Sequence, residues 1–271
     1  FYHKLLRDEG LVKSNDPFKR LLCQGMVLAD SFFVENEDGS KNWYNPAEVN
    51  IERDDKGKVI GAQHIRSGSA VQFGGMTKMS KSKNNGVDPQ TAIDKFGADT
   101  VRIFTMFAAP PEQTLEWNDD GVAGAQRFLR RLWNLCNDLQ GVGHQSLLKT
   151  NSQLNTTASL DELSIECRHI VYTSLEKALV DFSKNQFNTV IAACMTMLNA
   201  LSKEGISDGV KIEGASVLLR LLSPIAPHIC HQLWRHLELG NDILNASWPE
   251  VDKSALTTAC LLYTSDAADD P

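Results

Sequence analysis

Two lysines three positions apart, Lys78 and Lys81, are the residues of this sequence best suited to chemistry on a phosphate group. They stand in the run Lys78-Met79-Ser80-Lys81-Ser82, whose small serines can donate hydroxyl hydrogen bonds. An ammonium group is a compact point charge that suits the non-bridging oxygens of a polyphosphate. Lysines that reach those oxygens best as charge builds up on them lower the barrier to phosphoryl or nucleotidyl transfer.

The composition confines any binding of phosphate or nucleic acid to local patches. The 271 residues carry a formal net charge of -7, which argues against a protein held on polyanions by its bulk charge. By contrast, residues 78–83 hold three lysines and no acidic residue. The six cysteines form no CxxC pair, so we expect free thiols in a reducing cytoplasm and no metal site. No apolar run approaches the ~20 residues that span a membrane.

The region before the lysine-serine run has the pattern of a sheet. The dense apolar stretch within 20–35 predicts a buried strand of an α/β sheet that ends near Asp30. Residues 36–73 predict a small β-rich insertion, with a hairpin turn at 54–57. The polar, glycine-flanked stretch 74–86, which contains the run, should then be a surface loop that can open and close.

The region after the run has the pattern of helices. Asp88 followed by Pro89 is typical of a helix start and opens two short helices over 88–109. From residue 118 onward, apolar residues recur every three or four positions in successive stripes, which predicts an antiparallel helical bundle. At about 150 residues per domain, the length is consistent with two such parts. We place the boundary between them near residues 115–117.

The five residues 78–82 match the KMSKS signature of the class I aminoacyl-tRNA synthetases letter for letter. The context resembles that family as well, because a β region precedes the signature and helices follow it. Residues 79–86, 97–102, 22–30, 114–117 and 227–230 are similar to the bacterial leucyl-tRNA synthetases of that class, and the resemblance covers about residues 1–258. The valyl and isoleucyl members usually continue with a Leu-Gly-Asn or Arg-Gly-Asn type sequence, whereas Lys83-Asn84-Asn85-Gly86 resembles the leucyl group.

The resemblance implies a division of the chain. Residues 1–116 would be the C-terminal portion of a Rossmann-like catalytic domain, with the leucine-specific insertion at about 36–73. Residues 117–258 would be a helical anticodon-binding domain. The match fades after about Lys253, and residues 259–271 read like a non-native tail.

The resemblance also implies a reaction and its participants. ATP activates leucine to leucyl-adenylate, with Mg²⁺ bound to the nucleotide, and the 2′-hydroxyl of the terminal adenosine of tRNA-Leu then takes the leucyl group. In this scheme Lys78 and Lys81 are catalytic, and they bind ATP together with Met79, Ser80 and Ser82. The whole protein would be a cytoplasmic monomer.

Further positive charge lies beyond the signature. Lys83 is a candidate for contact with tRNA. Arg127, Arg130 and Arg131 lie off the apolar stripe of their predicted helix and could meet tRNA phosphates, although an ordinary solvated helix face would look the same. Trp133, Trp234 and Trp248 are expected in the core.

One departure from the family leaves alternatives open. No HIGH-type sequence, which is the other half of the ATP site in these enzymes, is present, so we expect no catalysis by this chain alone. A non-catalytic tRNA- or RNA-binding module is therefore one alternative. A class I synthetase for valine, isoleucine or methionine is another, and a nucleotidyltransferase that shares only the loop is a third.

Overall fold

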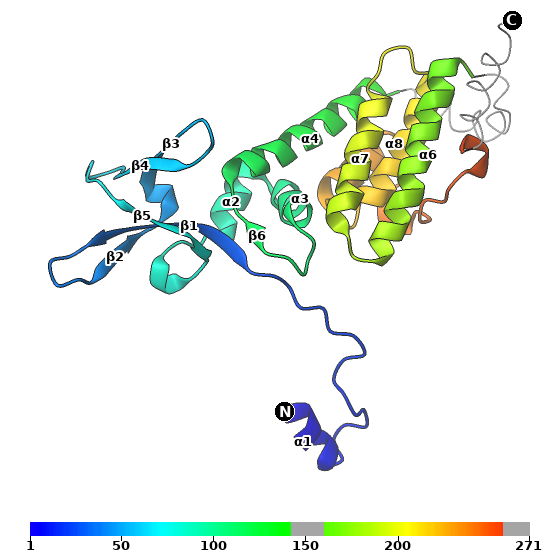
Figure 1. Ribbon diagram of the computed structural model, residues 1–271. Coiled ribbons are helices and arrows are strands. Elements are labelled where there is room, and N and C mark those ends of the chain that lie inside the picture. The colour runs from blue at the N-terminus through cyan, green and yellow to red at the C-terminus, as the bar shows by residue number, and fades with distance from the viewer. Residues whose placement is uncertain (142–159, 257–271) are drawn as a thin grey trace, which may run out of the picture.

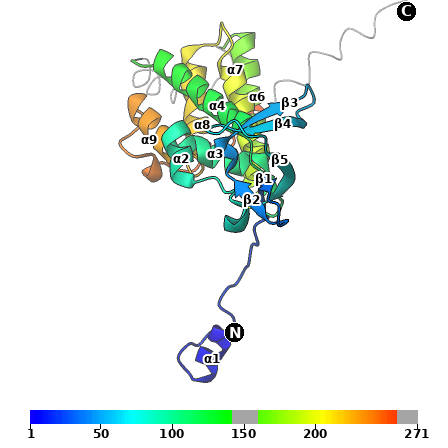
Figure 2. The same ribbon diagram turned by 90° about the vertical axis from the view of Figure 1, so that its left-hand side faces the viewer.

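The computed structural model describes residues 1–141 and 160–256. Small β-sheets occupy one end of the molecule and a helical bundle the other, with α2 and α3 between them (Figure 1). The predicted combination of α/β and all-α parts is confirmed. Helix α1 (Tyr2–Asp8) buries no residue and stands apart from the rest of the chain in both views (Figures 1 and 2).

Strand β1 (Val27–Glu35) is the centre of the main sheet. It pairs antiparallel with β2 (Lys41–Tyr44) and β5 (Gln72–Lys78), and its first residues pair in parallel with β6 (Leu115–Glu116). A separate hairpin joins β3 (Val49–Arg53) to β4 (Val59–His64) through the predicted turn at 54–57. The second sheet packs on the first through a small core of Phe32, Val49 and Val71.

The boundaries of the predicted apolar strand were wrong. The strand begins at Val27 and runs past Asp30 to Glu35, whereas Leu21 is 72 % exposed and outside any strand. Strands β2 and β5 pair only with residues 28–35. Gly25 and Met26 make single backbone hydrogen bonds to Pro111 and Leu115, and residues 20–24 have no strand to pair with. Apolar character alone does not make a strand, because the backbone N–H and C=O groups must also find partners.

The predicted surface loop at 74–86 is shorter than expected, because β5 continues to Lys78. Gly74 lies close to the neighbouring strand: a Cβ atom there would lie 2.8 Å from Ser31 Oγ. Gly74, one of the glycines that suggested a flexible loop, thus allows a close approach of two strands.

Two short helices follow the lysine-serine run. Asp88 caps α2 (Pro89–Phe96) by accepting a hydrogen bond from the backbone N–H of Thr91 at 2.8 Å, which confirms the predicted helix start. The helix ends at Gly97, which has a φ of +87°, and α3 (Ala98–Ala108) begins directly afterwards. The left-handed backbone at Gly97 is one that a glycine adopts without strain.

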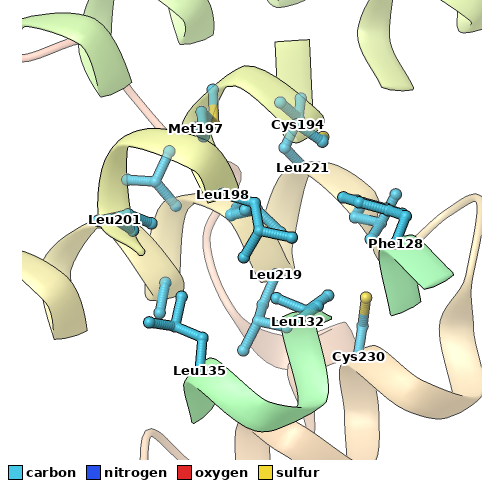
Figure 3. Close-up of a cluster of buried hydrophobic side chains, with 14 of the residues drawn as sticks. Phe128, Leu132, Leu135, Cys194, Met197, Leu198, Leu201, Leu219, Leu221 and Cys230 are labelled. Carbon is cyan, nitrogen blue, oxygen red and sulfur yellow. The ribbon is translucent and has the colours of Figure 1, made fainter. Parts of the chain in front are cut away.

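Within the described residues, five helices form the bundle: α4 (Asp119–Asp138), α6 (Glu162–Ser183), α7 (Phe187–Leu201), α8 (Asp208–Leu222) and α9 (Pro227–His236). Their inward side chains interdigitate in one large core (Figure 3), which the α3 residues Ile103 and Phe104 extend toward the sheets. Cys136, Cys194 and Cys230 are free thiols within it. Burial raises the pKa of Cys136 and of Cys194 to about 12, so these thiols stay protonated.

The expected burial of the tryptophans is correct for one of the three. Trp234 is 7 % exposed, but Trp133 is 40 % exposed and Trp248 is 44 % exposed. Trp133 stands one position after Leu132, which faces the core, so the helical step of about 100° carries the indole outward. No helix within the described residues is both long and apolar enough to cross a lipid bilayer.

Candidate functional site

The run Lys78–Ser82 begins on a strand and ends in a turn. Lys78 is the last residue of β5 and lies opposite Leu28 of β1. The backbone N–H of Met79 then donates to the carbonyl oxygen of Val27 at 3.0 Å, which extends the sheet by one more bond. The base of the run therefore has the rigidity of a paired strand rather than that of a free loop.

The second half of the run is a single 3₁₀ turn over Lys81–Lys83. Ser80 caps this turn, since its Oγ accepts from the backbone N–H of Lys83 at 3.3 Å. Asn84 closes it in the left-handed conformation, with a φ of +49°. The serine of the signature thus acts as a helix cap, and Lys81 and Ser82 stay exposed at the surface of the turn.

The two lysines assigned to phosphate chemistry are both exposed. Neither the Lys78 nor the Lys81 ammonium makes a hydrogen bond or ion pair with another residue of the described part of the chain. Both ammonium groups are therefore available for an anion. One lies at the end of a strand and the other on the turn that follows directly.

Lys83 differs from these two lysines in its burial and in its contacts. Its side chain is half-buried, and its Nζ lies 5.4 Å from the ring centroid of Trp43 on β2, a cation–π contact. Close by, the Asn45 side chain donates to the carbonyl oxygen of Gly86 at 3.2 Å. Residues Trp43 and Asn45, in and next to β2, thus contact the C-terminal side of the turn at Lys83 and Gly86.

Sequence reasoning missed Asn85, which is completely buried beneath the turn. Its carboxamide hydrogen-bonds to Ser80 and to the carbonyl oxygens of Ala29, Thr77 and Lys78. Nothing in the local pattern signals this role, since an asparagine in a polar, glycine-rich stretch is usually solvated.

The three arginines of α4 do not form one cluster. Arg130 borders an open hollow of about 540 Å³ together with Trp133 and His228. Arg131 borders a different hollow of about 290 Å³, and its Nη2 donates to Asn199 Oδ1 on α7 at 2.8 Å. Arg127 is exposed and borders neither hollow. The helix therefore presents its arginines over a broad arc.

Comparison with known proteins agrees with this arrangement. A family model described as "tRNA synthetases class I (I, L, M and V)" matches residues 66–118, which include the lysine run. A second, described as "Anticodon-binding domain of tRNA ligase", matches residues 168–268. The leucine–tRNA ligase of Pseudoalteromonas atlantica is 50 % identical over 266 residues, and that of Dichelobacter nodosus is 49 % identical over 257 residues.

The chain is therefore similar to the class I aminoacyl-tRNA synthetases over most of its length. Each of these two ligases matches 94 % of this chain, but the chain spans only about 30 % of their length. A solved Agrobacterium radiobacter LeuRS–tRNA–LeuAMS ternary complex has the same fold over 93 % of this chain and 26 % of its own, with a TM-score of 0.61 and 24 % identity.

Helix α3 connects the loop-bearing part of the chain to the bundle. Asp99 is almost buried and accepts from the backbone N–H of Ile229 at 2.7 Å, at the first turn of α9. It also pairs with Nδ1 of His228 at 2.8 Å. Three positions on, Arg102 donates to the carbonyl oxygen of Ile225 at 2.8 Å. His228 thus helps to dock α9 onto α3.

The described residues include no protein ligand set for a metal ion. No group of three or more His, Cys, Asp or Glu side chains there could hold one.

Proposed function

We propose that this chain is part of a leucine–tRNA ligase, to which it contributes the phosphate-binding loop and a tRNA-binding helical bundle. The observation that carries the proposal is the placement of Lys78 and Lys81. Their ammonium groups are exposed and unpaired within the described chain, and they flank one sharp change from strand to turn. About 50 % identity to curated leucine–tRNA ligases supports leucine as the amino acid.

In the proposed reaction, the carboxylate of leucine attacks the α-phosphorus of ATP, and pyrophosphate leaves with the bonding electron pair. Negative charge grows on the leaving oxygens as that bond breaks. Lys78 and Lys81 would stabilise this charge, with Lys81 the closer contact to the nucleotide, while Met79, Ser80 and Ser82 shape the turn that presents them. The 2′-hydroxyl of the terminal adenosine of tRNA-Leu then attacks the leucyl carbonyl, and AMP leaves.

Mg²⁺ belongs to this proposal as part of the nucleotide substrate. Because the described residues hold no ligand cluster for a metal, the phosphates and water would supply its ligands. Mg²⁺ commonly keeps several waters and binds through substrate phosphates, which agrees with a site built of lysines rather than carboxylates.

The helices after residue 117 would carry the tRNA. Exposed Arg127 and Arg130 are the candidates for contact with the sugar-phosphate backbone of the tRNA, since arginine pairs well with phosphate oxygens. We place the catalytic portion at 1–116, with the leucine-specific insertion at about 36–73, and the anticodon-binding part at 117–258. Lys83, which lies over Trp43, is a further candidate for contact with the tRNA.

The test is leucine-dependent ATP–pyrophosphate exchange by the whole protein. The Lys81→Ala variant should slow the exchange by about 100-fold or more, while leucine binding measured by calorimetry changes less than about twofold, because the ammonium acts on transition-state charge. Lys56→Ala, which removes the same charge from the exposed β3–β4 turn, is the matched control and should exchange at the normal rate. Normal exchange by Lys81→Ala would reject the assignment.

A further inference from the structure

Asn85 is the one residue of the turn region that is entirely removed from solvent. Its relative exposure is 0 %, whereas Asn84 and Gly86 on either side are exposed. A buried carboxamide is costly unless both its oxygen and its nitrogen find partners. The hydrogen-bond partners of Asn85 therefore indicate its structural role.

The carboxamide joins three segments of backbone. Its Oδ1 accepts from the N–H of Ser80 at 2.9 Å. Its Nδ2 faces the carbonyl oxygens of Ala29 and Thr77, both at 3.3 Å, and that of Lys78 at 3.4 Å. It also lies 3.3 Å from Thr77 Oγ1. The two N–H donors of Nδ2 are thus shared among four acceptor atoms contributed by β1 and β5.

This geometry holds the chain on both sides of Met79. The carbonyl group of Lys78 precedes Met79 and the N–H of Ser80 follows it, and the same side chain binds both. Since Ser80 in turn caps the 3₁₀ turn that contains Lys81, this one amide links the strand end that carries Lys78 to the turn that carries Lys81. Phosphate contacts that stabilise a transition state require such fixed positions, because a displacement of about 1 Å can cost about 100-fold in rate.

We propose that Asn85 is a positioning residue that fixes the spacing of Lys78 and Lys81 by tying Ser80 to the ends of β1 and β5. This inference rests on the proposed function of the loop in ATP chemistry. Asn85 itself, being buried, would touch neither nucleotide nor leucine.

An asparagine is required because the site needs an acceptor on one side and donors on the other. The carbonyl oxygens of Ala29, Thr77 and Lys78 can only accept, so the amide nitrogen must face them. An aspartate has the same shape but, when ionised, would set a carboxylate against those oxygens. When protonated, it regains one O–H donor while its other oxygen still accepts from Ser80.

The first measurement uses the 271-residue chain and requires no activity. Amide hydrogen exchange followed by mass spectrometry or NMR should show faster exchange at Ser80 in Asn85→Ala than in the unaltered chain. Asn50→Ala, which truncates an exposed asparagine on β3, should leave Ser80 unchanged. Thr77→Val, which removes only the Oγ1 acceptor, is the milder second variant should Asn85→Ala fail to fold. Unchanged Ser80 exchange in a folded Asn85 variant would overturn the inference.

The second measurement uses the whole protein in ATP–pyrophosphate exchange. Asn85→Ala should lower kcat by about 10- to 100-fold and leave the KM for leucine within about twofold, because the lysines are misplaced rather than removed. Asn85→Asp should be impaired at pH 8 and recover part of its rate as the pH falls toward 6, since burial raises the pKa of such a carboxyl. A general structural defect would not produce this recovery.

The two proposals can fail separately. If Asn85→Ala loosens Ser80 but exchanges pyrophosphate at the normal rate while Lys81→Ala does not, the positioning role is wrong and the function of the loop stands. If Lys81→Ala is fully active, the proposed function itself is rejected.

Discussion

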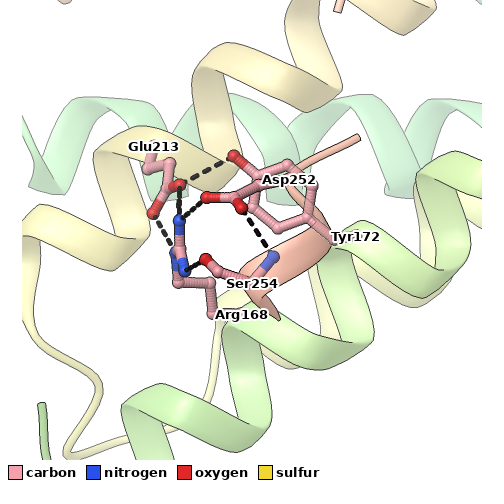
Figure 4. A network of polar contacts seen from close by, with 5 residues as sticks. All are labelled: Arg168, Tyr172, Glu213, Asp252 and Ser254. Atoms are coloured by element: carbon pink, nitrogen blue, oxygen red, sulfur yellow. Dashed lines mark hydrogen bonds and ion pairs between the residues drawn. The ribbon is translucent and has the colours of Figure 1, made fainter. Parts of the chain in front are cut away.

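Arg168 on α6 forms a bidentate ion pair with both carboxylate oxygens of Glu213 on α8 inside the bundle (Figure 4). Its Nε lies 3.0 Å from Oε2 and its Nη2 lies 3.0 Å from Oε1, while the arginine side chain is only 4 % exposed. Nη2 also pairs with Asp252, and Tyr172 donates its hydroxyl to Glu213 at 2.7 Å. One guanidinium thus joins α6, α8 and the segment that follows α9.

Removal of this guanidinium should destabilise the chain strongly. Arg168→Ala leaves Glu213 without its partner in a largely buried site, and breaking such a pair costs about 3–5 kcal/mol of the free energy of unfolding. Lys203→Ala is the matched comparison, because Lys203 pairs with Glu166 at 3.4 Å where both side chains are more than half exposed. That change should cost less than about 1 kcal/mol. Urea denaturation measures both, and equal effects would contradict the prediction.

Asp252 makes part of the stability depend on pH. Partial burial raises the pKa of its carboxyl, but hydrogen bonds from Ser254 and the Arg168 guanidinium outweigh this and lower it overall. A lowered pKa in the folded state adds stability above the unfolded pKa of about 4, and this stability is lost as the pH falls through the folded value. Asp252→Asn should therefore lose less free energy of unfolding than the unaltered chain between pH 5 and pH 3, by urea denaturation. Parallel pH profiles would exclude this contribution.

Two helical glycines should respond oppositely to alanine. At Gly214 on α8 a Cβ atom would lie 2.4 Å from Cδ2 of Leu201, a fully buried residue, so Gly214→Ala should cost about 1–3 kcal/mol through overpacking. At Gly124 on α4 the nearest atom would be Arg127 Nη2 at 3.6 Å. Gly124→Ala should therefore gain about 0.5–1 kcal/mol from helix propensity. Thermal unfolding of the two variants should move Tm in opposite directions; shifts of the same sign would contradict the packing.

The exposed arginines of α4 should contribute to tRNA binding through phosphates. In the whole protein, Arg127→Ala and Arg130→Ala should each weaken tRNA-Leu binding by about 2- to 5-fold, as expected for exposed charge contacts. Each should also reduce the slope of log K against log salt by about 1. Lys184→Ala, the same charge change at the exposed end of α6, is the control. Filter binding at several salt concentrations measures this; unchanged slopes in both arginine variants would place the tRNA elsewhere.

Much of the local structure could be predicted because it depends on neighbours in the chain. Asp88 and Pro89 start α2 through a cap that involves only Thr91, three positions away. The apolar stripes of α4 and α7 face the core as their spacing requires, since residues three or four apart share one side of a helix. The lysine-serine run suggested phosphate chemistry by residue type and spacing, and its match to the KMSKS signature made that interpretation specific; the role of its lysines stays a prediction.

The sequence predictions were wrong where the structure depends on segments that are distant in the chain. The extent of β1 depends on β2 and β5, which lie in separate later stretches of the chain. Gly74 looked like a hinge residue but is required by the proximity of Ser31. The assignment of Arg130 and Arg131 to two different hollows depends on how α7 and α9 pack against α4.

The sequence by itself determined that Lys78 and Lys81 stand in a signature for phosphate chemistry, and which segments become helices. Only the tertiary structure decided what holds those lysines in place, because the partners of Asn85 on Ala29 and Thr77 lie 56 and 8 positions away. A hydrogen bond across such a separation leaves no periodic pattern. It forms when packed strands exclude water from an amide whose polar atoms must then be satisfied by the backbone around it.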